Sequence, residues 1–267
     1  MSGTTFDYRP ESIYDGSMPV LGVIPARLGS TRLPRKPLQL IGGVPLVVRV
    51  AQRALEAGVT DALVVATDSD EIAATARKAG VDAVLTSPDH ESGTDRVAEV
   101  ARRAEYAGFD IVVNIQGDEP FLSPAALAGA VDQVRAGFDI GTAAGIVIGD
   151  AAQSPSLVKV VCTATGRALY FSRSAIPFFR DGGPAGHRRF HQHIGVYACT
   201  RSALLRWAAL EPTPLELAER LEQLRALEHG LSIGVTLLDE TALPGVDTQE
   251  DLERADAHWT ATARGAA

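Results

Sequence analysis

The sequence lacks several features that would assign it to common classes of protein. Its 2 cysteines, Cys162 and Cys199, form neither a C-x-x-C pair nor a zinc spacing, so we interpret them as buried, reduced thiols. No apolar run reaches the length of a membrane-spanning helix, and residues 1–19 contain no apolar segment typical of a secretory signal. The formal net charge of -8 argues against nucleic acid as a partner. These absences favour a cytoplasmic enzyme without membrane insertion.

Two familiar nucleotide-binding loops are also missing. No G-x-G-x-x-G follows the first predicted strand, and no G-x-x-x-x-G-K-[ST] occurs anywhere in the sequence. The sequence therefore disfavours a dinucleotide-dependent redox enzyme and a P-loop kinase.

What the first half does contain is an alternation of strand and helix patterns. The predicted strands are 20–24, 63–66, 83–85 and 111–113, and the predicted helices are 45–58, 71–79, 95–104 and 124–135. Such alternation predicts an α/β fold with a mostly parallel sheet and helices on both faces.

The second half is richer in strand patterns and predicts a smaller β-rich lobe. Its predicted strands are 141–147, 158–162, 168–171, 194–199 and 232–238, and its predicted helices are 215–229 and 249–259. We expect one domain over 20–259, between a flexible tail at 1–19 and a short tail at 260–267. Within it, 20–137 is the nucleotide half, 138–240 the acceptor half, and 241–259 the segment that returns to the first half.

Positive charge gathers in the loop after the first predicted strand, at Arg27, Arg32, Arg35 and Lys36. Ligands of open α/β sheets bind at the carboxyl ends of strands, and fixed cations there match phosphate oxygens. We interpret this loop as a triphosphate cradle rather than as a solvated basic loop.

Two acidic residues are candidates for a metal site. Asp118 follows the strand at 111–113, and a carboxylate facing a phosphate loop suits Mg²⁺, which takes carboxylate and phosphate oxygens. Asp247 precedes the closing helix. Each has an ordinary structural alternative: Asp118 can sit in a tight turn before Pro120, and Asp247 can belong to a helix cap formed with Thr248.

Three further patterns remain open from the residues alone. The polar run 90–96 can meet a nucleobase or phosphate, or it can simply begin a helix. His187, His191 and His193 favour hydrogen bonding over zinc, because nothing aligns them. The stripe Leu217, Leu221 and Leu224 is either core or an oligomer face.

Motifs in order along nearly the whole chain carry a family resemblance. They are I-P-A-R at 24–27, S-T-R-L-P at 30–34, K-P-L at 36–38, V-A-T-D at 65–68, S-G-T-D-R at 92–96, N-I-Q-G-D-E-P at 114–120, V-K-V-V at 158–161, A-L-Y-F-S-R at 168–173, I-P at 176–177, H-I-G-V-Y at 193–197, P-L-E at 214–216, L-E-Q-L-R at 221–225 and G-V-D-T at 245–248. Together they resemble the 3-deoxy-manno-octulosonate cytidylyltransferase family.

The resemblance implies a fold and an activity. The fold is a Rossmann-like, GT-A-like nucleotidyltransferase sheet, with 138–240 serving sugar binding and dimerisation in a homodimer. The activity is transfer of CMP from CTP to the anomeric hydroxyl of 3-deoxy-D-manno-octulosonate (Kdo) for lipopolysaccharide biosynthesis, with Mg²⁺ as cofactor and pyrophosphate as the second product.

The same resemblance assigns roles to residues. It implies Arg27, Lys36, Asp118 and Asp247 as catalytic residues, with the two aspartates holding Mg²⁺. The CTP-binding residues it implies are Pro25, Ala26, Arg27, Ser30, Thr31, Arg32, Lys36, Thr67, Asp68, Ser92, Gly93, Thr94, Arg96 and Gln116. On the sugar side it implies Arg173, His193, Tyr197, Glu222 and Gln223.

Departures and alternatives accompany this resemblance. Arg35 stands where the family often has glycine, the lead at 1–19 is longer than the family needs, and 181–189 matches poorly. A cytidylyltransferase for another sugar acid, such as sialic acid or 8-amino-Kdo, is the main alternative. A non-catalytic nucleotide-binding module is the alternative from a different class.

Overall fold

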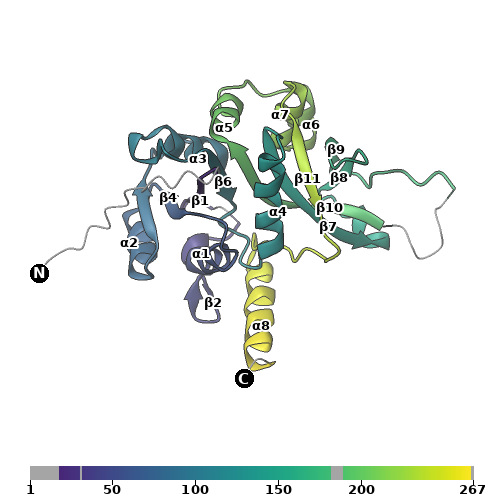
Figure 1. The fold of residues 1–267 in the computed structure, drawn as a ribbon. Helices are drawn as coiled ribbons and strands as arrows, with labels where there is room; N and C mark the ends of the chain where they lie inside the picture. Colours follow the sequence, from purple (N-terminus) through teal and green to yellow (C-terminus); the bar gives the residue numbers. More distant parts are fainter. Residues whose placement is uncertain (1–17, 31, 182–188, 266–267) are drawn as a thin grey trace, which may run out of the picture.

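A twisted sheet crosses the whole molecule, and both halves of the chain contribute strands to it (Figure 1). The computed structural model describes residues 18–30, 32–181 and 189–265. Among these residues the main path of the sheet runs β11-β7-β10-β6-β1-β4-β5. Its strands are β1 (Val20–Ala26), β4 (Ala62–Thr67), β5 (Asp82–Leu85), β6 (Ile111–Ile115), β7 (Ile140–Ile148), β10 (Arg189–Thr200) and β11 (Ile233–Leu237).

The sheet is mostly parallel, as the alternating pattern predicts. β1 pairs in parallel with both β4 and β6, β4 with β5, and β7 with β11. Along this path of described strands, β10 alone runs in the opposite direction, antiparallel to β6 and β7. A short extension, β8 (Lys159–Cys162) and β9 (Ala168–Ser172), attaches to β10 on the acceptor side.

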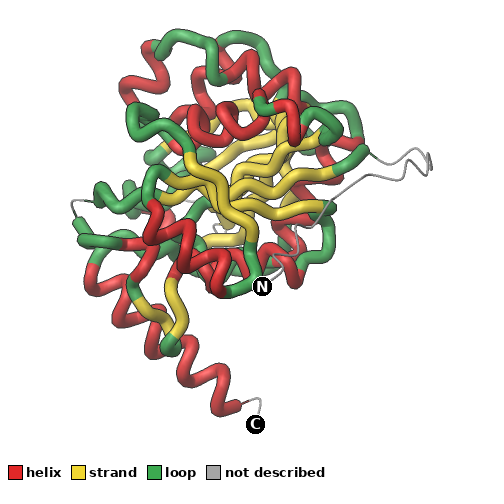
Figure 2. The backbone as a smooth tube through the Cα atoms, turned by 90° about the vertical axis from the view of Figure 1, so that its left-hand side faces the viewer, coloured by secondary structure: helices red, strands yellow, loops and turns green. Residues whose placement is uncertain are grey.

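Helices cover both faces of the sheet, and Figure 2 shows the strands lying between two helical layers. One apolar core lies under α1 (Leu46–Glu56), α2 (Asp70–Lys78) and α4 (Pro124–Arg135). The second core lies under α3 (Gly93–Arg102), α5 (Arg201–Trp207) and α7 (Glu222–Glu228). Because β1, β4 and β6 are buried on both faces, their residues form the continuous apolar runs seen in the sequence.

Short elements complete the chain. They are the 3₁₀ turns η1 (Lys36–Leu38), η2 (Ala104–Tyr106) and η3 (Gly149–Gln153), and the small hairpin of β2 (Leu40–Ile41) and β3 (Val44–Pro45). In the described part of the chain no helix is long and apolar enough to cross a membrane.

The predicted helix 215–229 is wrong, because two helices occupy this stretch. α6 (Pro214–Glu219) ends at Arg220, which has left-handed backbone angles of φ 55 and ψ 50, and α7 begins at Glu222. The break changes which side chains face inward. Leu221 and Leu224 are buried as core residues, whereas Leu217 is 54% exposed.

The closing helix is longer than the prediction of 249–259. α8 runs over Gln249–Gly265 and so includes residues that we assigned to the tail. It returns to the first half of the chain: Gly42 donates a backbone hydrogen bond to Asp256, and the guanidinium of Arg49 lies 4.0 Å from the centre of the Trp259 ring. This helix projects from the body of the molecule (Figure 1).

Candidate active site

The loop after β1 is held down by its apolar residues while its cations stay accessible. Leu33 and Pro37 are buried, and the backbone N–H of Leu33 donates to the hydroxyl of Ser30 at 3.2 Å. Arg35 takes a left-handed conformation, with φ 54, immediately before η1, and its side chain pairs with Glu71 on α2. Glycine adopts such a backbone conformation more readily than arginine does. Arg35 therefore points to α2, and Arg27, Arg32 and Lys36 are the cations of this loop that line the cleft.

Lys36 joins the two predicted metal ligands. Its Nζ lies 2.7 Å from Oδ2 of Asp118 and 2.8 Å from Oδ1 of Asp247. Burial lowers the pKa of Lys36, but the two neighbouring carboxylates outweigh burial and the net shift is upward. Arg32 contacts the other oxygen of Asp247 at 3.0 Å. The basic loop and the two acids, far apart in sequence, thus meet at one point.

Backbone contacts fix the position of Asp247. The N–H of Val246 donates to the carbonyl of Asp118 at 2.8 Å, which ties the two acidic loops together. The Oδ2 of Asp251 accepts from the backbone N–H groups of Asp247 and Thr248 at 3.1 and 2.8 Å, which caps the start of α8. Both interpretations of this segment therefore hold: Thr248 belongs to a helix cap, and the Asp247 side chain faces the cations.

A cleft of about 350 Å³ extends from these charges along the carboxyl ends of β1 and β6. Most residues implied for CTP line it: Pro25, Ala26, Arg27, Ser30, Arg32, Lys36, Ser92, Gly93, Arg96 and Gln116. Three others do not. Thr67 is fully buried at the end of β4, Asp68 pairs with Arg96 at 3.1 Å, and Thr94 donates to Glu222 at 2.8 Å. Thr31 lies outside the described residues.

One part of the cleft is built around Pro25, which two glycines approach closely. A Cβ on Gly117 would lie 2.7 Å from the carbonyl oxygen of Pro25, and a Cβ on Gly93 would lie 3.4 Å from its Cγ. Glycine at both positions therefore leaves the surroundings of Pro25 open. Ser92 caps α3 here, its hydroxyl accepting from the N–H of Asp95 at 3.1 Å. The small residues around Pro25 suit a planar ring.

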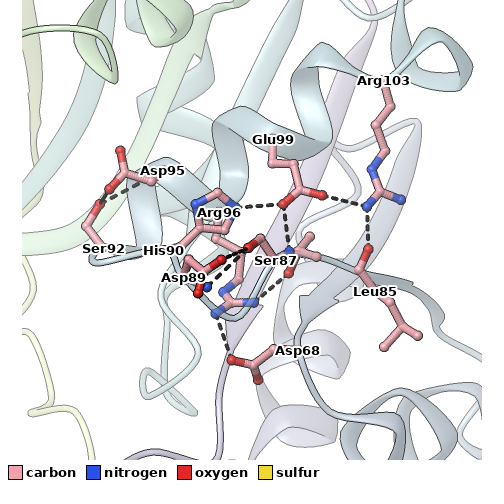
Figure 3. Close-up of polar contacts among 11 residues, drawn as sticks. Asp68, Leu85, Ser87, Asp89, His90, Ser92, Asp95, Arg96, Glu99 and Arg103 are labelled. Atoms are coloured by element: carbon pink, nitrogen blue, oxygen red, sulfur yellow. Dashed lines mark hydrogen bonds and ion pairs between the residues drawn. The ribbon is translucent and has the colours of Figure 1, made fainter.

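His90 is a lining residue that the sequence-based assignment missed. It belongs to the polar run 90–96, so a signal existed, but the resemblance gave it no role. Figure 3 shows its ring beside Glu99, with Arg103 on the far side of that carboxylate. His90 Nε2 lies 2.6 Å from Glu99 Oε2, and Arg103 lies 2.7 Å from Oε1.

A second cleft of about 340 Å³ adjoins the first, and Asp118 and Asp247 line both. His193 and Gly195 of β10 contribute to it, together with residues 156–158 and 242–245. Burial lowers the pKa of His193 to about 4, so its imidazole is neutral near pH 7. Its Nε2 lies 3.0 Å from the hydroxyl of Thr142. This contact is a hydrogen bond of the kind expected for the histidine, and His187 of the same expectation lies outside the described residues.

The other residues implied for the sugar do not line this second cleft. Tyr197 is buried between the rings of His193 and Trp207, at centroid distances of 5.2 and 5.5 Å. Gln223 is buried at the start of α7, and Glu222 beside it accepts from Thr94. Arg173 donates to the backbone carbonyls of residues 155, 219 and 220, which fixes the α6–α7 corner. The structure thus places these side chains in the supporting wall.

Glu119 is a further residue that the assignment missed, although it stands in the motif 114–120. It lines the second cleft, and its Oε1 lies 3.6 Å from where a Cβ on Gly195 would be. Burial raises the pKa of Glu119 to about 8, and the charge of Asp118 adds to that rise. The side chain is therefore mostly protonated near neutral pH when no further cation is bound.

A cationic loop facing paired carboxylates at the carboxyl edge of a parallel sheet defines a nucleotidyltransferase of the α/β class. The family model described as cytidylyltransferase matches residues 21–233. Two curated relatives named 3-deoxy-manno-octulosonate cytidylyltransferase are similar over most of their length. The one from Gemmatimonas aurantiaca is 58% identical over 91% of this chain and 95% of its own, and the one from Methylococcus capsulatus is 48% identical over 88% and 95%.

A solved structure is similar as well. It is described as a CMP:2-keto-3-deoxy-manno-octonic acid synthetase complexed with CTP, and it matches 91% of this chain and 99% of its own with a TM-score of 0.85 and 38% identity. The chain therefore belongs to the 3-deoxy-manno-octulosonate cytidylyltransferase family. A nucleotidyl transferase from Methanothermobacter, at 18% identity and a TM-score of 0.61, shares the fold.

Proposed function

We propose that the chain transfers CMP from CTP to the anomeric hydroxyl of Kdo, releasing pyrophosphate, as a step of lipopolysaccharide biosynthesis. The observation that carries this proposal is the pair Asp118 and Asp247, which share contact with Lys36 and border both clefts. The first cleft has the cations for a triphosphate and, around Pro25, the small residues that leave room for a base. The second supplies a neighbouring volume for the acceptor. The names of the relatives and the CTP-complexed neighbour support the choice of substrates.

The reaction is an in-line displacement at the α-phosphorus of CTP. The anomeric oxygen of the sugar forms a bond to this phosphorus, the bond from phosphorus to the bridging oxygen breaks, and pyrophosphate leaves. The hydroxyl proton passes to solvent. Arg27, Arg32 and Lys36 hold the triphosphate and neutralise the charge that builds up on the leaving group, and the walls of the two clefts hold the reacting oxygen and phosphorus in line.

Mg²⁺ is part of this proposal, and the donor set fits it. Asp118 and Asp247 already place two carboxylate oxygens around one positive group, the ammonium of Lys36. Mg²⁺ prefers one or two carboxylates, with phosphate oxygens and water completing its shell. When bound, the ion supplies charge neutralisation at the phosphates and lowers the pKa of the attacking hydroxyl. The flexible side chain of Lys36 would then be free to reach the phosphates instead of the two carboxylates.

A pyrophosphate-release assay tests the activity. With CTP, Kdo and Mg²⁺ we expect release that stops on addition of a chelator and returns with excess Mg²⁺. A panel containing Kdo, 8-amino-Kdo and sialic acid, and a reaction without any sugar, serve as controls. Faster pyrophosphate release with another sugar acid would show that this acid, rather than Kdo, is the substrate. CTP binding without release for any acid would show a non-catalytic module instead.

We also propose that the chain works as a homodimer in the cytoplasm. Apolar side chains on the acceptor half are exposed, including Ile148 at 56% and Leu169 at 60%, and a partner copy would cover such surface. Light scattering after size exclusion tests this, because a mass near the 28.2 kDa of one chain at micromolar concentration would contradict a dimer.

A further inference from the structure

The imidazole of His90 is held in one orientation by Glu99. Its Nε2 contacts Oε2 of Glu99 at 2.6 Å, and the same oxygen accepts the backbone N–H of Ser87 at 2.9 Å (Figure 3). Arg103 donates to the other oxygen of Glu99 at 2.7 Å. Burial raises the pKa of Glu99, but these donors outweigh burial and lower the pKa to about 2. Glu99 is therefore a carboxylate, which can only accept hydrogen bonds, so the proton of this contact lies on Nε2.

The second ring nitrogen of His90 is available to a ligand. Among the described residues Nδ1 has no hydrogen-bond partner, while the residue itself lines the first cleft. In a neutral imidazole that carries its proton on Nε2, Nδ1 is a hydrogen-bond acceptor. The cleft therefore contains one fixed side-chain acceptor from the 90–96 run.

The residues beside this acceptor in the chain, and Pro25 next to them, suit a base rather than a phosphate. Pro25, Ser92 and Gly93 are its neighbours in the lining, and the glycine leaves the proline ring uncovered. The one cation of the 90–96 run, Arg96, is buried and already bound to Asp68 at 3.1 Å and to the hydroxyl of Thr86 at 2.5 Å. The accessible cations lie instead on the loop after β1, where they face Asp118 and Asp247.

We propose that His90 recognises the exocyclic amino group of the nucleobase, with Nδ1 accepting a hydrogen bond from it, and that Glu99 is the positioning residue that fixes this tautomer. The inference rests on the proposed use of CTP and adds the basis of base selection. Cytosine carries an amino group, a hydrogen-bond donor, at this ring position. Uracil carries a carbonyl oxygen at the same ring position, and that oxygen would face the lone pair of Nδ1. A site with a fixed acceptor rejects a ligand that lacks the matching donor.

Binding of CTP and UTP without any sugar acid, measured by calorimetry, tests the proposal through paired substitutions. His90→Asn keeps an acceptor oxygen near the place of Nδ1, whereas His90→Gln keeps a donor towards Glu99 and loses that acceptor. We expect His90→Gln to raise the Kd of CTP about tenfold with little change for UTP, which is the scale of one lost hydrogen bond. His90→Asn stays within about threefold of the wild type for both nucleotides.

Glu99→Gln tests the positioning role separately. The glutamine amide can donate to Nε2, which moves the ring proton to Nδ1 and turns the acceptor into a donor, as a carboxylate-to-amide change does in a catalytic triad. We expect CTP binding to weaken about tenfold and UTP binding to strengthen, so that the preference is lost or reversed. A merely structural role for Glu99 would weaken both nucleotides alike. His229→Gln, an exposed histidine at the end of α7, is the control and should change neither Kd.

The outcomes separate this proposal from the proposed activity. Equal weakening of CTP and UTP in both variants, or a wild type without preference for CTP, would overturn the role of His90. Should His90→Gln fail to fold, the Glu99→Gln comparison decides alone. A protein that prefers CTP through His90 but releases no pyrophosphate with Kdo upholds this proposal and refutes the activity. If the protein transfers CMP normally and both variants keep the same preference for CTP, the proposed activity is upheld and the role of His90 is refuted.

Discussion

Replacing Asp247 with asparagine separates charge from shape at the point where the two clefts meet. The amide is isosteric, and the aspartate side chain is 45% exposed, so its pairs with Lys36 and Arg32 are partly solvated. Such exposed pairs contribute at most about 1 kcal/mol to folding. Asp247→Asn should therefore unfold within about 2–4 °C of the wild type in a thermal scan. The backbone contacts of Asp247 with Asp251 and of Val246 with Asp118 do not depend on the charge.

Activity should fall far more than stability. The variant loses the carboxylate that faces the triphosphate loop, and deletion of one preorganised electrostatic group costs about 10²–10³ in turnover. The assay is pyrophosphate release at saturating CTP and Kdo over a range of Mg²⁺ concentrations, where half-saturation should also shift to higher Mg²⁺. Asp239→Asn is the matched control, since its side chain is 100% exposed and lines neither cleft. Turnover of Asp247→Asn within threefold of the wild type would refute the assignment.

Three further predictions concern residues that shape or support the clefts. Gly117→Ala should lose about 1–3 kcal/mol, seen in chemical denaturation, because its Cβ would lie 2.7 Å from the carbonyl oxygen of Pro25; an unchanged midpoint would contradict this close approach. The pKa of Glu99 is lowered to about 2, so its carboxylate stabilises the fold fully above about pH 4.5 and progressively less as the pH falls towards 2. The difference in the free energy of unfolding between the wild type and Glu99→Gln should therefore shrink from pH 7 to pH 3 in urea titrations. Lys159→Met should cost about 2 kcal/mol or more, because the buried ammonium donates to the carbonyls of Ser154 and Arg173 at 3.0 and 2.6 Å; equal denaturation midpoints would count against it.

The nucleotide half could be predicted because its signals are local. A strand followed by a cationic loop fixes where Arg27 and Lys36 lie, and the polar run after β6 fixes Asp118 at the same edge. The meeting with Asp247 could not be derived from spacing. Lys36 and Asp247 are 211 positions apart, and their contact depends on the path of the whole second half. The resemblance supplied that contact, whereas the residues themselves favoured a helix cap.

The misses have specific physical causes. Periodicity alone joined 215–229 into one helix, since a single left-handed residue at Arg220 leaves the apolar spacing nearly unchanged. The residues implied for the sugar were placed by motif, and motifs do not say whether a side chain lines a cleft or supports its wall, as Tyr197 and Arg173 show. His90 belongs to the polar run 90–96, which was singled out from the sequence. Its partner Glu99 is nine residues further along, in a helix whose pattern is that of an ordinary amphipathic helix, so the pair could not be recognised from the sequence.

The reversed strand β10 explains why an acceptor cleft lies beside the nucleotide cleft at all. β6 ends at Ile115, which pairs with Val196, so the part of β10 before this pair extends beyond the carboxyl end of β6. That extension brings His193 and Gly195 past the edge where Asp118 lies, and pairing with β7 and β8 stabilises it there. A parallel strand in this place would leave the edge, as β1 and β4 do, through a loop. One antiparallel strand therefore supplies a rigid wall on the far side of the carboxylates that face the nucleotide.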